Sequence, residues 1–152
     1  MTGDTASEVL TSRLGYLLKH AYLALADASA EALAPLGIDG RELAVLAVLA
    51  AHDPLSQLEV AGRLGVDRTT MVALVDTLET KQLVARRRSP HDRRRNIVEL
   101  TATGREVLHD AELTRQDVER RFLAPLSPTQ TTGFLHALQS LVAAPPPRAA
   151  DT

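Results

Sequence analysis

A short arginine-rich segment at residues 86–96, with the sequence RRRSPHDRRRN, places the strongest constraint on the fold. Six of its eleven residues are arginine. Short β-prone runs at 83–84 and 96–100 flank the segment, and the turn formers Pro90 and Asp92 lie near its centre. The pattern predicts a β-hairpin whose projecting tip is strongly positive.

Two closely spaced helices are predicted immediately before this hairpin. Ser56 and Glu59 have the spacing of a capping box at the start of the first helix, and Gly65 ends it. Asp67 then starts a second helix that continues to about Lys81. Helices joined by so tight a turn are typical of a helix-turn-helix. Together with the hairpin, they predict a winged helix, with the second helix as the one that reads DNA.

The chain before this region is also predicted to be helical. Apolar residues recur at helical spacing over 7–34, and the pattern stops near Pro35 and Gly37. Asp39 and Glu42 form another capping box, which opens a second, almost wholly apolar helix. The first helix is too long to be hidden inside one small domain.

Two further helices follow the hairpin, so the predicted fold is mainly α, a winged helix of order α-α-α-α-β-β-α-α. The terminal helices have more apolar surface than one winged helix can cover, which favours a symmetric homodimer. The predicted layout is one unit at 1–144, with dimerisation helices at 7–34 and 105–143, a winged-helix DNA-binding region at 39–104, and a disordered tail at 145–152.

The distribution of charge supports a polyanion-binding surface. The net charge is −2, but residues 60–105 contain ten Arg or Lys against five Asp or Glu. That segment therefore carries +5 and the rest of the chain −7. Such separation suits one DNA-facing surface on an acidic body. Taken alone, the charge also fits a merely solvated surface.

Composition argues against several other classes of protein. There is no cysteine, which excludes disulfides, thiolate zinc sites and thiol redox sensing. Common metal, phosphate-loop and nucleophile motifs are absent, and the five histidines fall on separate predicted elements. We therefore expect neither an enzyme nor a bound metal or cofactor. The polar N-terminus and the lack of a long apolar run predict a cytoplasmic, nucleoid-associated protein with no membrane partner.

The helix-turn-helix, followed by Asp92-x-Arg94 and then Leu100-Thr101-x-x-Gly104, resembles the MarR family of bacterial transcription regulators. The resemblance implies a ligand-responsive regulator, most often a repressor, that binds a pseudo-palindromic operator in double-stranded DNA as an obligate homodimer. It also implies recognition helices in successive major grooves and wing arginines in the flanking minor grooves. Paired helix-turn-helix units generally read half-sites about one helical turn apart.

The stretch that matches the family's recognition helix begins with Arg68, Thr69 and Thr70, which are best placed to reach bases or phosphates. Arg68 is a candidate for a guanine contact and, equally, for a phosphate contact. Thr70 is a candidate for a thymine methyl or a phosphate. The chain departs from the common family pattern at three positions. Ala73 and Thr77 stand where the family often has arginine, and Gln82 stands where a glycine usually ends the helix.

Within the hairpin, Asp92 lies two residues before Arg94 and is expected to hold that guanidinium bidentately and orient it toward the minor groove. An ordinary surface ion pair of little energetic value is the alternative. The neighbouring arginines would contact phosphates. The predicted DNA-binding residues are Ser56, Gln57, Arg68, Thr69, Thr70, Ala73, Arg86, Arg88, Asp92, Arg93, Arg94 and Arg95.

Effector binding is predicted on the first helix. Arg13, Tyr16 and His20 follow one another at spacings of three and four, so one helix face would present a cation, a phenol and an imidazole. These groups suit the small aromatic or anionic molecules to which the family responds. The rim of a dimer interface is the alternative interpretation.

Two other functions remain open from the sequence. An architectural or nonspecific DNA-binding protein would combine an arginine-rich wing with a weak recognition helix. A winged-helix module for protein interaction would have lost DNA binding, and its wing would not need six arginines.

Overall fold

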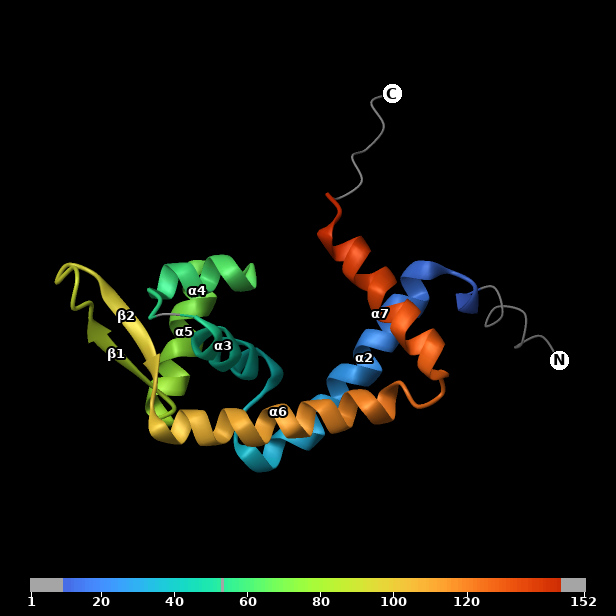
Figure 1. The fold of residues 1–152 in the computed structure, drawn as a ribbon, viewed down its shortest axis with the longest axis horizontal. Helices are drawn as coiled ribbons and strands as arrows, with labels where there is room; N and C mark the ends of the chain where they lie inside the picture. Colours follow the sequence, from blue (N-terminus) through green and yellow to red (C-terminus); the bar gives the residue numbers. More distant parts are fainter. Residues whose placement is uncertain (1–9, 53, 146–152) are drawn as a thin grey trace, which may run out of the picture. The chain divides into compact units, whose positions relative to one another are not determined.

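The computed structural model describes residues 10–52 and 54–145, and its ribbon is drawn in Figure 1. It confirms the mainly α winged helix. Residues up to Val118 form one compact unit and those from Glu119 another. No helix in the described ranges combines the length and apolar character needed to cross a membrane. The elements are α2 (Leu14–Leu33), the 3-10 helix η1 (Ala34–Leu36), α3 (Gly40–Ala51), α4 (Gln57–Leu64), α5 (Arg68–Thr80), β1 (Val84–Arg88), β2 (Asn96–Leu100), α6 (Ala102–Phe122) and α7 (Pro128–Ala143).

The first helix differs from its prediction at the N-terminal end. Arg13 adopts an extended conformation, with φ −89° and ψ 124°, so α2 begins at Leu14 and the continuous helix expected over 7–34 is interrupted. Thr11 and Ser12 precede the break, and such side chains compete with helical backbone hydrogen bonds. Residues 7–9 and 146–152, the latter covering most of the predicted tail, lie outside the described residues.

The three N-caps predicted for the helix-turn-helix region are confirmed. The Asp39 carboxylate accepts the backbone N–H groups of Arg41 and Glu42, both at 2.9 Å. Ser56 and Asp67 cap α4 and α5 in the same manner. These caps satisfy backbone donors that have no partner within the helix, and they set where each helix starts.

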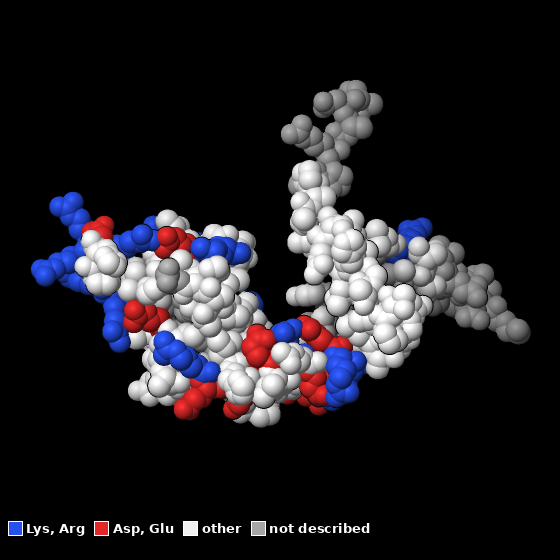
Figure 2. Space-filling model, in the orientation of Figure 1, with Lys and Arg blue, Asp and Glu red and all other residues white. Residues whose placement is uncertain are grey.

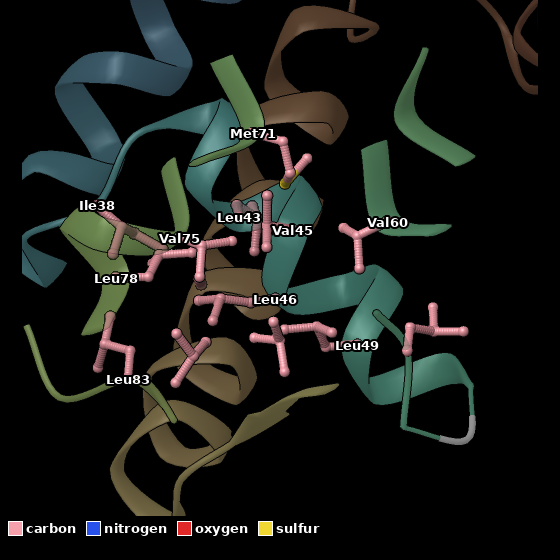
Figure 3. Close-up of a cluster of buried hydrophobic side chains, with 14 of the residues drawn as sticks. Ile38, Leu43, Val45, Leu46, Leu49, Val60, Met71, Val75, Leu78 and Leu83 are labelled. Atoms are coloured by element: carbon pink, nitrogen blue, oxygen red, sulfur yellow. The ribbon is translucent and has the colours of Figure 1, made fainter. Parts of the chain in front are cut away.

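The core of the first unit lies between α3, α5 and the base of the wing. Figure 3 shows the buried side chains of α3 and α5 in contact around one centre. Because almost every position of α3 is apolar, this helix is covered by neighbours on several sides. Residues of this core that are almost completely buried are Val45, Leu46, Val60, Met71, Val75, Leu78 and Val84.

A half-buried ion pair also connects α3 to the end of α5. Lys81 follows the last residue of α5, and its Nζ donates to both carboxylate oxygens of Glu42, at 2.7 and 3.0 Å. The same Nζ donates to the carbonyl oxygen of Gly37 at 2.7 Å. Glu42 is only 4% exposed. The contact therefore ties the C-terminal end of α5 to the start of α3.

The hairpin is confirmed, but its first strand is longer than the run predicted at 83–84. β1 and β2 pair antiparallel from Val84↔Leu100 to Arg88↔Asn96, so three of the arginines lie in a strand and not in the turn. The backbone N–H of Val98 also donates to the carbonyl of Leu55 at 2.8 Å. This bridge attaches the wing to the segment that precedes α4.

The residue that links α5 to the wing has a strained backbone. Gln82, where the family usually has glycine, adopts a φ of 60°. A side chain is disfavoured in this left-handed region, whereas glycine adopts it readily. Gln82→Gly is therefore expected to raise the free energy of unfolding by about 0.5 to 1 kcal/mol. Relief of the backbone strain in the folded state should outweigh the greater backbone entropy that glycine gives to the unfolded chain. Urea unfolding measures this effect, and a lower midpoint would contradict it.

Candidate nucleic-acid interface

The predicted recognition helix, α5, has one buried and one open face. Met71, Val75 and Leu78 are packed into the core, whereas Arg68 and Ala73 are exposed. The open face therefore begins at the N-terminus of α5. No partner of Arg68 is found among the described residues.

Thr70, a predicted DNA contact, also takes part in the helix cap. Its hydroxyl donates to Oδ2 of Asp67 at 2.6 Å, and its backbone N–H donates to Oδ1 at 2.9 Å. These bonds hold the pKa of the Asp67 carboxyl below its ordinary value. The Thr70 methyl group and hydroxyl lone pairs remain for a ligand, but its hydroxyl proton is committed to Asp67.

Among the described residues, the tip of the wing carries several arginines that form no ion pair and one acid, Asp92. Arg88, Arg93 and Arg94 are exposed and have no ion-pair partner within the described part of the chain. Figure 2 shows Lys and Arg side chains projecting from the wing at the left of the view. Guanidinium groups presented in this way suit phosphates and the narrow minor groove.

Asp92 acts on the backbone of the tip and not on a guanidinium. Its Oδ1 accepts the backbone N–H of Arg94 at 2.9 Å, and its carbonyl accepts that of Arg95 at 2.9 Å. The bidentate Asp92–Arg94 pair predicted from the sequence is absent from the ion pairs of the described residues. A short acidic side chain satisfies the amide two residues ahead in an Asx turn, which leaves the Arg94 side chain projecting outward.

Arg86 and Arg95, both predicted DNA contacts, have guanidinium groups that are already engaged. Arg86 forms ion pairs with Asp76 and Glu79 of α5. Arg95 forms one with Glu59 of α4. The pattern of the sequence identified these residues by charge alone and missed their acidic partners, which lie on other elements.

The two predicted contacts from α4 have local roles as well. The Ser56 Oγ accepts the backbone N–H of Glu59 at 3.3 Å, and this caps the helix. The Gln57 Oε1 accepts the Nε–H of Arg86 at 3.1 Å. Both residues are half-buried beside the wing.

Glu59 has a strongly shifted titration. The hydrogen bond from Arg95, with those from Ser56, lowers the pKa of its carboxyl from 4.5 to about 2. Because the ionised form is favoured in the folded protein, its contribution to stability is complete above pH 4.5 and is lost as the pH falls toward 2. The Glu59–Arg95 contact is therefore constant across neutral pH.

This shift is directly measurable. In a carbon-13 NMR titration, the Glu59 carboxyl of the wild type is expected to stay ionised down to about pH 3. In the Arg95→Met variant its midpoint should move toward the ordinary 4.5, because the largest cause of the shift is removed. The same midpoint in both proteins would show that the ion pair does not form in solution.

The predicted effector residues do not line the apolar pocket beside α2. The rings of Tyr16 and His20, both on α2, are in tilted contact with centroids 4.0 Å apart and an interplanar angle of 39°, and Arg13 is the N-cap of that helix. The pocket, of about 530 Å³, lies further along α2, where it meets α3, α4 and α5. Its lining is Tyr22, Leu25, Ala26, Ser29, Ala30, Asp39, Gly40, Arg41, Ala44, Leu64, Val66 and Leu74.

The pocket was missed because its walls come from several separate segments, each of which appears as ordinary core or cap in the sequence. No cluster of three or more His, Cys, Asp or Glu that could hold a metal ion occurs in the ranges 10–52 and 54–145. The chemistry of this region is that of an apolar pocket with a guanidinium at its edge.

The family model described as MarR family matches residues 36–95, the span from η1 to the wing. An HTH-type transcriptional repressor of Mycobacterium tuberculosis, Rv2887, is 33% identical over 128 residues, which cover 84% of this chain and 92% of the repressor. The chain belongs to the MarR family. This membership confirms the family predicted from the helix-turn-helix and the wing motif.

This MarR-family protein is similar in structure to regulators that have been solved with DNA or a small molecule bound. The transcriptional repressor CouR, bound to a 23-mer DNA duplex, is 34% identical with a TM-score of 0.82, covering 88% of this chain and 94% of that chain. CouR from Rhodococcus jostii RHA1, bound to p-coumaroyl-CoA, is 29% identical with a TM-score of 0.78, covering 92% and 97%.

Proposed function

We propose that this MarR-family protein is a transcription repressor that binds a pseudo-palindromic operator as a homodimer and acts on chromosomal DNA at the nucleoid. The observation that carries the proposal is the pairing of an open recognition-helix face with a wing tip whose arginines have no acidic partner among the described residues. The similarity to Rv2887 and to DNA-bound CouR supports it.

A homodimer is supported by apolar side chains left uncovered in the single chain. On α2, Leu14 is 66% and Tyr22 69% exposed. On α7, Leu141 and Val142 are 63% and 85% exposed. Exposed apolar surface of this extent on both terminal helices suits burial against a second copy. The helices α2, α6 and α7 are therefore proposed to form the dimer interface.

The proposed contacts with DNA divide between two elements. The exposed N-terminal residues of α5, Arg68 and Thr69, would enter the major groove, together with the Thr70 methyl group. The wing tip would reach the adjacent minor groove through Arg93 and Arg94. A duplex that satisfies both elements must present half-sites about one helical turn apart.

Fluorescence anisotropy against two duplexes tests sequence-specific binding. The first duplex contains a palindrome selected from the promoter next to the gene, and the second contains the same bases in scrambled order. At fixed physiological salt, the palindrome is expected to bind about a thousandfold more tightly. Equal affinities would overturn sequence-specific regulation and support architectural DNA binding.

Architectural binding is the second candidate because the middle of α5 offers little for base readout. Ala73 and Thr77 are both exposed and small, and the Thr77 hydroxyl donates to the Ala73 carbonyl at 2.9 Å. Neither side chain supplies the bidentate hydrogen bonds that best distinguish one base pair from another. The anisotropy comparison separates the two candidates.

Release by a small molecule is proposed to occur through the pocket beside α2. Its lining is largely apolar, and Arg41 lies at its edge, 3.7 Å from its nearest carboxylate partner, Asp39. This suits a ligand with an aromatic body and one carboxylate. Aromatic carboxylates, with p-coumaroyl-CoA as a further probe, should displace operator from the wild type and fail to do so from Arg41→Met. Equal displacement from both proteins would place the ligand elsewhere.

A further inference from the structure

Five of the six arginines of the wing divide into two groups by what they touch, and the sixth, Arg87, pairs with Glu99 within the hairpin. Arg88, Arg93 and Arg94 have no ion-pair partner in the described part of the chain, whereas Arg86 and Arg95 reach helices outside the wing. We propose that Arg86 and Arg95 are positioning residues that attach the wing to the helix-turn-helix, and that they do not bind DNA. The inference rests on the proposed DNA-binding function and assigns separate roles within it.

Arg86 joins the wing to both helices of the helix-turn-helix. Its two terminal nitrogens donate to Asp76 and Glu79 of α5, and its Nε donates to Gln57 of α4 at 3.1 Å. Its backbone N–H also donates to a Glu79 carboxylate oxygen at 3.4 Å. The side chain is only 27% exposed. All three nitrogens of this guanidinium are thus used within the protein, so a phosphate would have to compete with two carboxylates.

Arg95 makes the second attachment, at the opposite end of the tip. Its guanidinium pairs with Glu59, whose Oε2 also accepts the backbone N–H of Ser56 at 2.7 Å. The backbone bridge between Val98 and Leu55 lies close to it in the sequence. The wing therefore has one side-chain anchor in β1, directed mainly toward α5, and one immediately before β2, directed toward the first turn of α4.

The two roles predict different responses to salt. A cation that contacts phosphate releases counterions, so its removal lowers the slope of log affinity against log salt by about 0.9. A cation already neutralised by carboxylates releases none. Loss of an anchor should weaken binding at every salt concentration by the same factor, because the wing must then be ordered when the complex forms.

Removing the charge of an acidic partner changes DNA affinity in opposite directions under the two roles. If Arg95 bound DNA, removing the Glu59 charge would free a cation and tighten binding. As a positioning residue, Arg95 loses its anchor in Glu59→Gln, and binding should weaken about tenfold with an unchanged salt slope. Glutamine still serves as the capping-box partner of Ser56, so α4 keeps its cap. Asp76→Asn is expected to act in the same direction through Arg86.

Glu99→Gln is the matched control. Glu99 also pairs with a wing arginine, Arg87, at 3.1 Å, but both residues belong to the hairpin and anchor nothing outside it. Its loss removes the same charge and should leave affinity unchanged or slightly higher. A second comparison sets Arg86→Met and Arg95→Met against Arg93→Met, and only Arg93→Met should reduce the salt slope.

All variants are titrated by anisotropy over a range of KCl concentrations, with operator and scrambled duplex, after urea unfolding has shown that each is folded. Weaker binding by Glu59→Gln with an unchanged slope supports the proposal. Tighter binding by Glu59→Gln, or a reduced slope for Arg95→Met, overturns it. If the wild type fails to prefer the operator, the proposed function fails. The role of Arg95 is still decided on the scrambled duplex, by whether Glu59→Gln binds more weakly or more tightly and by the salt slope of Arg95→Met.

Discussion

Replacing Arg94 with alanine is expected to weaken operator binding about hundredfold, the largest loss for any single residue of the wing. The Arg94 side chain has no acidic partner in the described part of the chain, and its backbone is fixed by Asp92. A guanidinium held at a projecting tip can enter a narrow minor groove with little further loss of freedom. Anisotropy titration of the operator duplex at fixed salt measures the effect.

Asp92→Ala provides the comparison for Arg94→Ala. Asp92 orders the tip by accepting the backbone N–H of Arg94. Its loss should increase the flexibility of the loop but removes none of the arginine side chains. We expect a smaller reduction in affinity, about three- to tenfold, with no change in salt slope. Wild-type affinity for Arg94→Ala would refute the minor-groove role. A larger loss for Asp92→Ala than for Arg94→Ala would also contradict it.

Replacing Gly104 with alanine is expected to lower the free energy of unfolding by about 3 kcal/mol or more. A Cβ at this position would lie 1.9 Å from the carbonyl oxygen of Leu83. That carbonyl accepts the backbone N–H of Thr101 at 3.1 Å, and the Thr101 hydroxyl donates to Gln82 O at 2.7 Å. The backbone on both sides is thus fixed, and the start of α6 would have to move away from the wing.

Gly62→Ala is the control for this substitution. Gly62 lies in α4, outside the proposed dimer interface, and nothing is found within 4 Å of its added Cβ. Alanine is the better helix former, so this variant should be as stable as the wild type or more stable by about 0.5 to 1 kcal/mol. Urea unfolding of the three proteins gives the comparison. An unchanged midpoint for Gly104→Ala would show that α6 and the wing are not in close contact in solution.

Features encoded by neighbouring residues were predicted from the sequence. The caps formed by Asp39, Ser56 and Asp67 each depend on residues no more than three positions apart, so spacing alone identifies them. The family motif Leu-Thr-x-x-Gly was recognised, but its cause was not. Only the structure shows that Gly104 has no side chain because the backbone of Leu83 lies against it.

Features that depend on contacts between distant residues were not predicted. Arg86 and Arg95 were assigned to DNA because an arginine-rich segment gives no indication of which guanidinium meets a carboxylate on another helix. Asp92 was matched with the correct residue, Arg94, but with its side chain and not its backbone. The pocket was missed for the same reason, because its walls come from four helices and the segments that join them.

Hydroxyl-radical footprinting of the operator tests the central proposal most directly, because it reports which grooves the protein occupies. The proposed repressor should protect two minor-groove segments that are related by the two-fold axis of the palindrome. These segments should flank a central region that contains the two half-sites, about one helical turn apart. Arg93→Ala and Arg94→Ala should lose these flanking protections and keep those in the centre. Protection that is uniform along the duplex, or that is absent from the palindrome, would contradict the account.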